Sequence, residues 1–369
     1  MRILYQGLLE SPASWARVGR GLVRAWLDAG HDVTALRTRG FKFTAGFPVD
    51  DRLQWCTLEE ARATTERESA VGLGFLQPPQ VDRLLGAPRA NLFVWEADRV
   101  PAPWITALRV LDQVVVPSRF TADALVTSGL DAARVHVEPY GIDRDAAERA
   151  ASARPIAPSA PFTFLCVAAP HWRKGLRELF VAYARAFRSS DLVRLRIKTT
   201  YDPGRSKRRL AFEIPSWRQL VRECGLDERE APAIDIEIAS PHDATMLLEY
   251  AASDVYVGPS WGESFGLAHL EAAAIGLPVI ATKCGATPEL LGASEDLVRV
   301  HQREAGPSIY HPTPGAQVAV ADIDSLARRL RWHFDHPEES RAIGRHRAPG
   351  FRTMTWAKCA AGILAALPA

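Results

Sequence analysis

Residues 254–271 read DVYVGPSWGESFGLAHLE, and this stretch decides how the whole chain is interpreted. An apolar run ends at Pro259, a loop of small residues follows, and a helix is expected to begin near Leu267. The backbone amides of Phe265, Gly266 and Leu267 would lie at the exposed start of that helix. Unpaired N–H groups and the positive end of the helix dipole favour a phosphate there, and Gly266 lets the backbone approach a ligand closely.

Two glutamates flank this turn, one in the loop and one in the early part of the helix. The carboxylate of Glu271 can accept two hydrogen bonds from the vicinal hydroxyls of a ribose. Glu263 is placed to accept hydrogen bonds from hydroxyls of another sugar, on the far side of the phosphates. The alternative is structural: one glutamate is favoured near a helix N-terminus, and the other lies on the surface without a function. The spacing alone leaves both interpretations open.

A strand–helix–strand pattern extends in both directions from this stretch. Residues 2–6, about 16–29 and 31–36 form one such unit, with Gly30 ending the helix and a length that parallel pairing requires. Further strands are expected at 70–75, 90–95, 113–117, 162–167, 193–198, 234–238 and 278–281, and further helices at about 175–187, 244–252 and 267–275. The fold class is therefore α/β, with mainly parallel sheets.

Three other segments complete the predicted organisation. Residues 144–161 shift to Ala, Pro, Ser and Arg without a strand pattern, and are expected to be the linker between two domains. Residues 201–214 are basic and irregular, which predicts a surface excursion. After Asp322, two helical stretches are expected, the last at about 355–367. Asp322 and Asp324 have the spacing of a metal motif but fit a helix N-cap and a first-turn acid better.

The length, charge balance and cysteine content of the chain exclude several classes of protein. A length of 369 residues suits two domains, and 45 basic against 43 acidic residues do not favour nucleic acid as a partner. The five cysteines are scattered without a C-x-x-C pair, so we expect neither a disulfide framework nor a zinc cage, and a reducing compartment. With no signal-like N-terminus and no apolar run near the ~18 residues that span a bilayer, we expect a cytoplasmic protein with at most peripheral membrane contact.

The stretch resembles the signature of the retaining glycosyltransferases of family 4, the glycosyl transferases group 1 domain, in which two glutamates are separated by seven residues. Residues 263–267 and Glu271 match it in order, and the match continues through 272–281 and 285–289. The resemblance implies the GT-B fold, with two Rossmann-like domains facing across a cleft. Residues 1–150 would form the acceptor domain, completed by a C-terminal helix at about 352–369 that includes Trp356. Residues 160–350 would form the nucleotide-sugar donor domain.

The resemblance also implies a reaction. The protein would move a sugar from a UDP-, GDP- or ADP-linked donor to a hydroxyl of a glycan, lipid or small-molecule acceptor, with retention and without a metal or a further cofactor. Glu271 would bind the nucleotide ribose, and Glu263 would bind hydroxyls of the donor sugar. Front-face substitution through an oxocarbenium-like state would need no enzymic nucleophile, and domain closure would exclude water.

Arg173 and Lys174 follow the first strand of the second domain. At the carboxyl end of a strand they can face a pyrophosphate and stabilise the departing nucleoside diphosphate. The alternative is an ordinary basic helix start, although the positive helix end disfavours cations there. The family has a lysine at the position of Lys174, which favours phosphate binding. The family's additional arginine is replaced here by Ala169, and Arg173 is the candidate substitute.

The first domain matches the family more loosely. Many relatives have a histidine beside the reacting carbon, where this chain has Trp95 and Glu96, so a catalytic histidine is not carried over. Glu96 could polarise an acceptor hydroxyl or pair structurally with Arg99. These departures keep open a degenerate member that binds a nucleotide sugar or a partner protein without catalysis. A nicotinamide-dependent oxidoreductase is rejected because the chain lacks a G-x-G-x-x-G turn after a strand.

Overall fold

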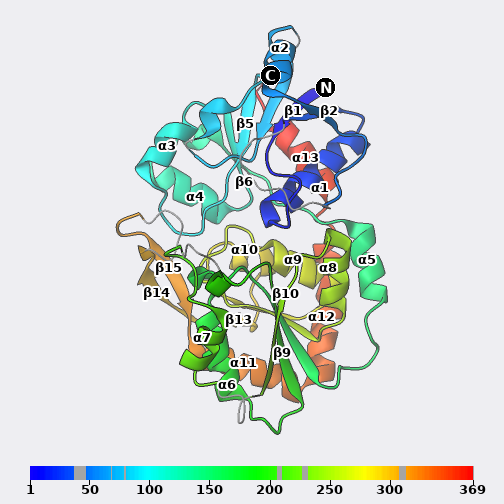
Figure 1. Cartoon of the computed structure of the whole chain (residues 1–369), viewed down its shortest axis with the longest axis vertical. Helices are drawn as coiled ribbons and strands as arrows, with labels where there is room; N and C mark the ends of the chain where they lie inside the picture. Colours follow the sequence, from blue (N-terminus) through cyan, green and yellow to red (C-terminus); the bar gives the residue numbers. More distant parts are fainter. Residues whose placement is uncertain are drawn as a thin grey trace. The chain divides into compact units, whose positions relative to one another are not determined.

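The computed structural model describes residues 1–36, 47–67, 69–78, 80–205, 210–226, 232–306 and 313–368. Figure 1 shows the course of the chain. The chain divides into two compact units. Unit 1 comprises Met1–Trp95, Arg99–Asp143 and Met354–Ala369, and unit 2 comprises Glu96–Asp98 and Arg144–Thr353. In the described part of the chain, no helix combines the length and the apolar character needed to cross a membrane.

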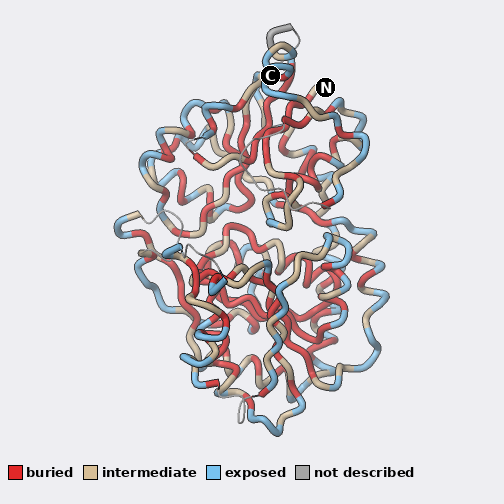
Figure 2. Tube along the Cα trace, viewed as in Figure 1, coloured by how far each residue is buried: buried red, intermediate tan, exposed pale blue. Residues whose placement is uncertain are grey.

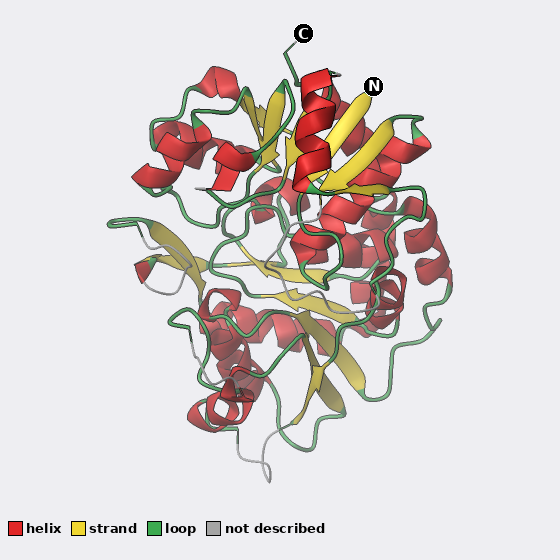
Figure 3. Ribbon diagram, turned by 45° about the horizontal axis from the view of Figure 1, so that its top comes forward, coloured by secondary structure: helices red, strands yellow, loops and turns green. Residues whose placement is uncertain are grey.

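Unit 1 contains a parallel sheet of seven described strands in the order β3-β2-β1-β4-β5-β6-β7. The strands are β1 Arg2–Gln6, β2 Asp32–Leu36, β3 Gln54–Cys56, β4 Val71–Gly74, β5 Arg89–Leu92, β6 Gln113–Val116 and β7 Val135–Val137. The helices are α1 Ser14–Asp28, α2 Leu58–Arg67, α3 Ala102–Leu108, α4 Arg119–Thr127 and α13 Trp356–Ala365. Helices α1, α2, α3 and α4 each lie between two strands that follow one another along the chain, as parallel pairing requires. Figure 3 shows the helices in red and the strands in yellow.

Helix α1 is an example of a helix in unit 1 whose apolar positions, predicted from the periodicity of the sequence, are buried. Its apolar positions Val18, Leu22 and Trp26 are buried, each adding about 1.5–3 kcal/mol of apolar burial. The helix ends at Gly30, whose φ of 78° is open to glycine without strain. The C-terminal helix α13 packs against α1, and the indole N–H of Trp26 donates to the carbonyl oxygen of Ala360 at 3.1 Å.

Unit 2 contains a parallel sheet in the order β10-β9-β8-β11-β12-β13, and a separate antiparallel hairpin of β14 and β15. The strands are β8 Phe162–Val167, β9 Val193–Thr199, β10 Ala233–Ile238, β11 Val255–Gly258, β12 Val279–Thr282, β13 Leu297–Val298, β14 Val300–Glu304 and β15 Gln317–Ala321. The helices are α5 Arg144–Ser152, α6 Leu176–Ala186, α7 Trp217–Glu223, α8 Asp243–Ala251, α9 Leu267–Ile275, α10 Thr287–Leu291, α11 Ile323–Asp335 and α12 Pro337–Phe351. Strands β8, β9 and β11 contribute buried apolar side chains to one core cluster with α6 and α11. Figure 2 colours the backbone by the burial of each residue.

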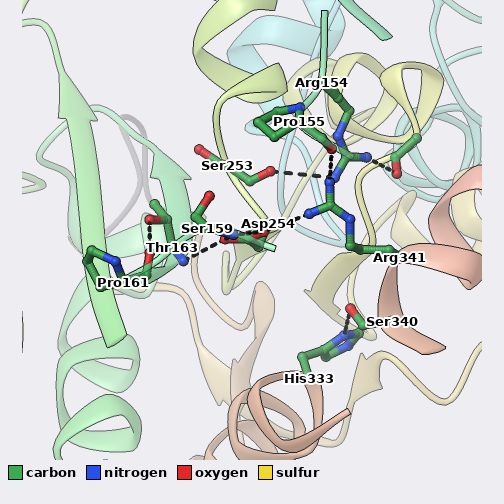
Figure 4. Close-up of polar contacts among 11 residues, drawn as sticks. Arg154, Pro155, Ser159, Pro161, Thr163, Ser253, Asp254, His333, Ser340 and Arg341 are labelled. Carbon is green, nitrogen blue, oxygen red and sulfur yellow. Dashed lines mark hydrogen bonds and ion pairs between the residues drawn. The ribbon is translucent and has the colours of Figure 1, made fainter. Parts of the chain in front are cut away.

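Buried charged side chains hold residues 153–163 against the rest of unit 2 (Figure 4). Asp254, which is 1% exposed, accepts hydrogen bonds from the backbone amides of Ser159 and Thr163 and pairs with Arg341 at 3.1 Å. Arg341 also donates to the carbonyl oxygen of Pro155, and Arg154 donates to that of Gly276. A buried carboxylate with this many donors is costly to unpair, so the network holds the start of β8 in place.

The structure corrects two expectations and adds one element that the sequence did not predict. Residues 144–152, expected to belong to a linker, form helix α5; Ala147 and Ala150 bury one face, and Arg144 pairs with Glu148 one turn later at 2.9 Å. Three helices follow Asp322 instead of two, because a break at His336 separates α11 from α12. The β14–β15 hairpin was not predicted. The N-cap role is confirmed: the Asp322 carboxylate accepts from the amide of Ser325 at 2.6 Å.

Candidate functional site

The turn between β11 and α9 is shaped by two glycines and a buried histidine. Gly266 has φ of 91°, and a Cβ atom there would collide with Nδ1 of His269. A Cβ atom at Gly258 would collide with Nε2 of the same ring. We predicted that Gly266 lets a ligand approach; the structure adds an internal reason, because the imidazole, 2% exposed, fills the space under the turn. No side-chain cap is recorded at the start of α9 in this described segment.

Glu263 lies in this turn, and several side chains contact its carboxylate. Its Oε1 accepts from Nζ of Lys174 at 2.6 Å and from Oγ of Ser260 at 2.7 Å, and Nη1 of Arg173 is 3.7 Å away. Burial alone would raise the pKa of Glu263, but the positive charges of Lys174 and Arg173 outweigh it and lower the pKa to about 2. Glu263 is therefore a carboxylate near neutral pH, able to accept hydrogen bonds but unable to donate a proton.

Arg173 and Lys174 come from the loop after β8, in the short 3-10 helix Trp172–Lys174. Gly175 follows with φ of 64°, and a Cβ atom there would collide with the carbonyl oxygen of Pro259. The amide of Trp261 donates to the carbonyl oxygen of Arg173 at 2.7 Å. These backbone contacts bring the loops after β8 and β11 together, so cations and carboxylate meet although 89 residues separate Lys174 from Glu263.

Arg173 is buried and joins three groups. Its Nη1 donates to the carbonyl oxygen of Gly262 at 2.7 Å and lies 3.7 Å from Oε1 of Glu263, and its Nη2 pairs with Oε1 of Glu96 at 3.0 Å. Glu96 and Arg173 both belong to unit 2. The structural pairing of Glu96 with Arg99 that we considered is wrong: Arg99 is exposed, and the carboxylate pairs with Arg173, which is far away in sequence but holds a buried charge in need of a partner.

Glu271 lies in α9, two residues after His269, and is 5% exposed. The hydroxyl of Tyr250, on α8, donates to its Oε2 at 3.1 Å. Glu271 is thus a buried carboxylate held by a neighbouring helix and not an exposed surface acid. Its predicted role at a ribose remains a prediction, as do the roles of Phe265, Gly266 and Leu267 at a phosphate.

Sequence reasoning missed several partners of these residues. Glu178, in the first turn of α6, accepts from the indole N–H of Trp261 at 3.1 Å. Ser260 holds Glu263, and a Cβ atom at Gly285 would collide with the backbone of Glu263, whose carbonyl oxygen accepts from the amide of Ala286. Ser260 lies three residues from Glu263 and could have been suspected. The other contacts join distant segments and leave no local signal.

The charges of this cluster balance: the cations of Arg173 and Lys174 face the carboxylates of Glu96 and Glu263. Such a cluster can present both positive charge and hydrogen-bond acceptors to one ligand. Among the described residues, no group of three or more His, Cys, Asp or Glu side chains is arranged to hold a metal ion.

Part of the chain is similar in sequence to known glycosyltransferases. Residues 161–331 match the family model described as glycosyl transferases group 1. The chain is 26% identical over 263 residues to the MMP alpha-(1->4)-mannosyltransferase of Mycolicibacterium hassiacum, covering 70% of this chain and 54% of that protein. It is 30% identical over 178 residues to the D-inositol 3-phosphate glycosyltransferase of Corynebacterium efficiens, covering 44% of this chain and 38% of that protein. The matched regions thus span about half of these curated relatives or less.

Two solved structures resemble the fold over nearly the whole chain. The sucrose-phosphate synthase of Thermosynechococcus elongatus has a TM-score of 0.71 at 16% identity, covering 99% of this chain and 98% of that chain. The Anabaena protein Alr3699/HepE, in complex with UDP and glucose, has a TM-score of 0.67 at 15% identity, with 99% and 98% covered. At these identities the likeness concerns the fold, which is two Rossmann-like domains of the GT-B class.

Proposed function

We propose that the protein is a glycosyltransferase that moves a sugar from a nucleoside-diphosphate sugar to an acceptor hydroxyl with retention of configuration. The match of residues 161–331 to the glycosyl transferases group 1 family model supports this proposal. The observation that carries the proposal is the cluster of Lys174, Arg173 and Glu263. It combines two cations and an ionised acceptor at the carboxyl ends of β8 and β11, where parallel sheets bind their ligands.

Lys174 and Arg173 would stabilise the leaving diphosphate. Bond cleavage at the anomeric carbon transfers an electron pair to the phosphate oxygen, and buried cations near that oxygen lower the barrier. The first turn of α9 would add backbone amides and the positive end of its dipole. Because these groups supply the positive charge, we propose that the reaction needs no metal.

Glu263 would orient the donor sugar. Its pKa of about 2 keeps it ionised, so it would accept hydrogen bonds from sugar hydroxyls and would not act as a general acid. We propose front-face substitution through an oxocarbenium-like state, without a covalent intermediate, in line with the family resemblance. Glu271 would bind the ribose, and the bound nucleotide would be uridine, guanosine or adenosine diphosphate. The acceptor would be a hydroxyl of a glycan, lipid or small molecule.

The five free cysteines suit a reducing compartment, and we place the reaction in the cytoplasm, with any membrane contact peripheral.

Turnover of nucleotide sugars tests the proposal. The protein is incubated with UDP-, GDP- and ADP-sugars, and slow donor hydrolysis is measured with and without EDTA, with the product anomer followed by NMR. We expect one donor class to be hydrolysed with retention and without EDTA inhibition, and this activity to fall at least 100-fold in Glu263→Ala and Lys174→Ala. Glu339→Ala and Lys358→Ala are matched controls, because both side chains are exposed and lie outside the motif. Nucleotide binding without turnover of any donor would instead indicate a degenerate binding module.

A further inference from the structure

Residues 201–205 and 210–217 are described by the structure, and Tyr201, Phe212 and Ile214 contact the segment just before Arg173 and Lys174. We predicted a basic, irregular surface excursion for 201–214. Part of the described segment is different: Glu213, Ile214 and Trp217 are buried, and Ile214 and Trp217 join the core cluster of unit 2. A surface excursion would not bury these side chains, so the segment has a structural task.

Backbone hydrogen bonds attach this segment to the cation loop. The amide of Trp172 donates to the carbonyl oxygen of Phe212, and the amide of Ile214 donates to that of Pro170, both at 2.9 Å. Together they form an isolated antiparallel bridge between His171 and Glu213. Arg173 and Lys174 follow this bridge directly in the sequence, so the backbone is held in place just before the two cations.

Side chains reinforce the bridge in a continuous chain. The Tyr201 hydroxyl donates to Oε1 of Glu213 at 2.6 Å, and Nε2 of His171 lies 3.2 Å from the same hydroxyl oxygen. Glu213 also accepts from the amide of Leu210 at 2.9 Å through Oε2. The ring of Phe212 packs edge-on against His171, with centroids 4.9 Å apart.

Only one assignment of hydrogens satisfies the hydrogen bonds that link His171, Tyr201 and Glu213. A carboxylate can only accept, so Tyr201 uses its hydrogen on Glu213, and its oxygen is left to accept from His171. Nε2 of His171 therefore carries the hydrogen. Burial, together with the charges of Arg173 and Lys174, lowers the pKa of His171 to about 3, so the ring stays neutral next to the two cations.

We propose that His171, Tyr201 and Glu213 are positioning residues that hold Lys174 and Arg173 where the leaving diphosphate of the proposed reaction develops its charge. This inference rests on the proposed function and adds residues outside the family signature to its machinery. Because catalysis by fixed charges depends on their placement to within about 1 Å, loosening this bridge should affect turnover more than donor binding.

Tyr201→Phe tests the proposal, since it removes one hydroxyl and keeps the ring. We expect kcat for the donor to fall about 10-fold, with KM changed less than threefold. Tyr183→Phe is the matched control: its hydroxyl donates to the carbonyl oxygen of Ala233 at 3.1 Å in the same unit. It should leave kcat within twofold. Glu213→Ala should behave like Tyr201→Phe, whereas Glu213→Gln, which keeps an acceptor, should recover most of the turnover.

A second measurement does not depend on activity. The amide of Lys174 donates to the carbonyl oxygen of His171 at 3.0 Å, so loosening the bridge should speed hydrogen exchange of the amides at 172–175 about 10-fold in Tyr201→Phe and not in Tyr183→Phe. Equal exchange in both variants would overturn the proposal. If the unmodified protein turned over no donor but the exchange difference appeared, the proposed function would fail and the positioning of the loop would stand. An active protein with equal kcat in Tyr201→Phe would refute the positioning role alone.

Discussion

Glu263→Gln is expected to lower the free energy of unfolding at pH 7 by about 3 kcal/mol. The side chain is 13% exposed, and its pKa falls from an ordinary 4.5 to about 2 in the folded protein. At about 1.4 kcal/mol for each pH unit, this difference corresponds to roughly 3 kcal/mol. Removing one partner of a buried ion pair costs about 3–5 kcal/mol by a separate argument, and the two values agree.

The pH dependence follows from the same shift. Because the folded pKa is depressed, the stabilisation is fully present above pH 4.5 and is lost as the pH falls toward 2. Urea unfolding of the protein and of Glu263→Gln should therefore differ most at neutral pH and converge below pH 4. In Lys174→Met/Glu263→Gln the loss should be smaller than the sum of the single variants, because no unpaired charge remains.

Asp335→Asn serves as the control for this experiment. Asp335 pairs with Arg331 at 2.7 Å, but both side chains are 41% exposed, so the change should cost less than about 1 kcal/mol. If Glu263→Gln cost no more than Asp335→Asn, and the Lys174 and Glu263 variants were additive, the buried charge cluster would not exist as described.

Three further predictions concern the rest of the second domain and one helix end. Glu271→Ala should weaken nucleoside-diphosphate binding by about 1–3 kcal/mol in calorimetry, and an unchanged Kd would remove Glu271 from the ribose site. Gly266→Ala should lower Tm clearly more than Gly30→Ala, because both need positive φ but only the first adds a collision, whereas Gly30 has open space around it. Arg341→Met should cost about 3 kcal/mol in urea unfolding by removing the cation that forms an ion pair with the buried Asp254, and a loss below about 1 kcal/mol would contradict this.

The regular elements were predictable because their signals are local. Strand β8 and helix α9 have the bounds expected from apolar runs and the periodicity of the sequence. The three-residue strands β3 and β7 carry too few residues for a period to show. Strands β14 and β15 form a hairpin whose connection is long, so no short turn signal predicts their pairing. Helix α5 was not predicted because the segment that follows it contains prolines, and the whole stretch has the composition of a linker.

The sequence pointed to the residues of the charge cluster as candidates, but not to the contacts that they make with one another. The motif placed Glu263, Glu271 and Lys174 as candidates, and the structure brings Glu263 and Lys174 into contact. Arg173 and Glu96 are 77 positions apart in the sequence, so their ion pair depends on tertiary packing and leaves no local signal. The same holds for His171 and Tyr201, whose contact depends on how residues 210–214 return to the loop.

Three glycines allow the backbones around the charge cluster to touch. Side chains at Gly175, Gly262 and Gly285 would collide with the carbonyl oxygens of Pro259, Glu96 and Glu263. In a library of random variants selected for activity, these positions should tolerate substitution as poorly as the charged residues do. Changing donor preference by enlarging side chains at these positions should therefore fail, and engineering has to begin from residues whose side chains already point away from these contacts.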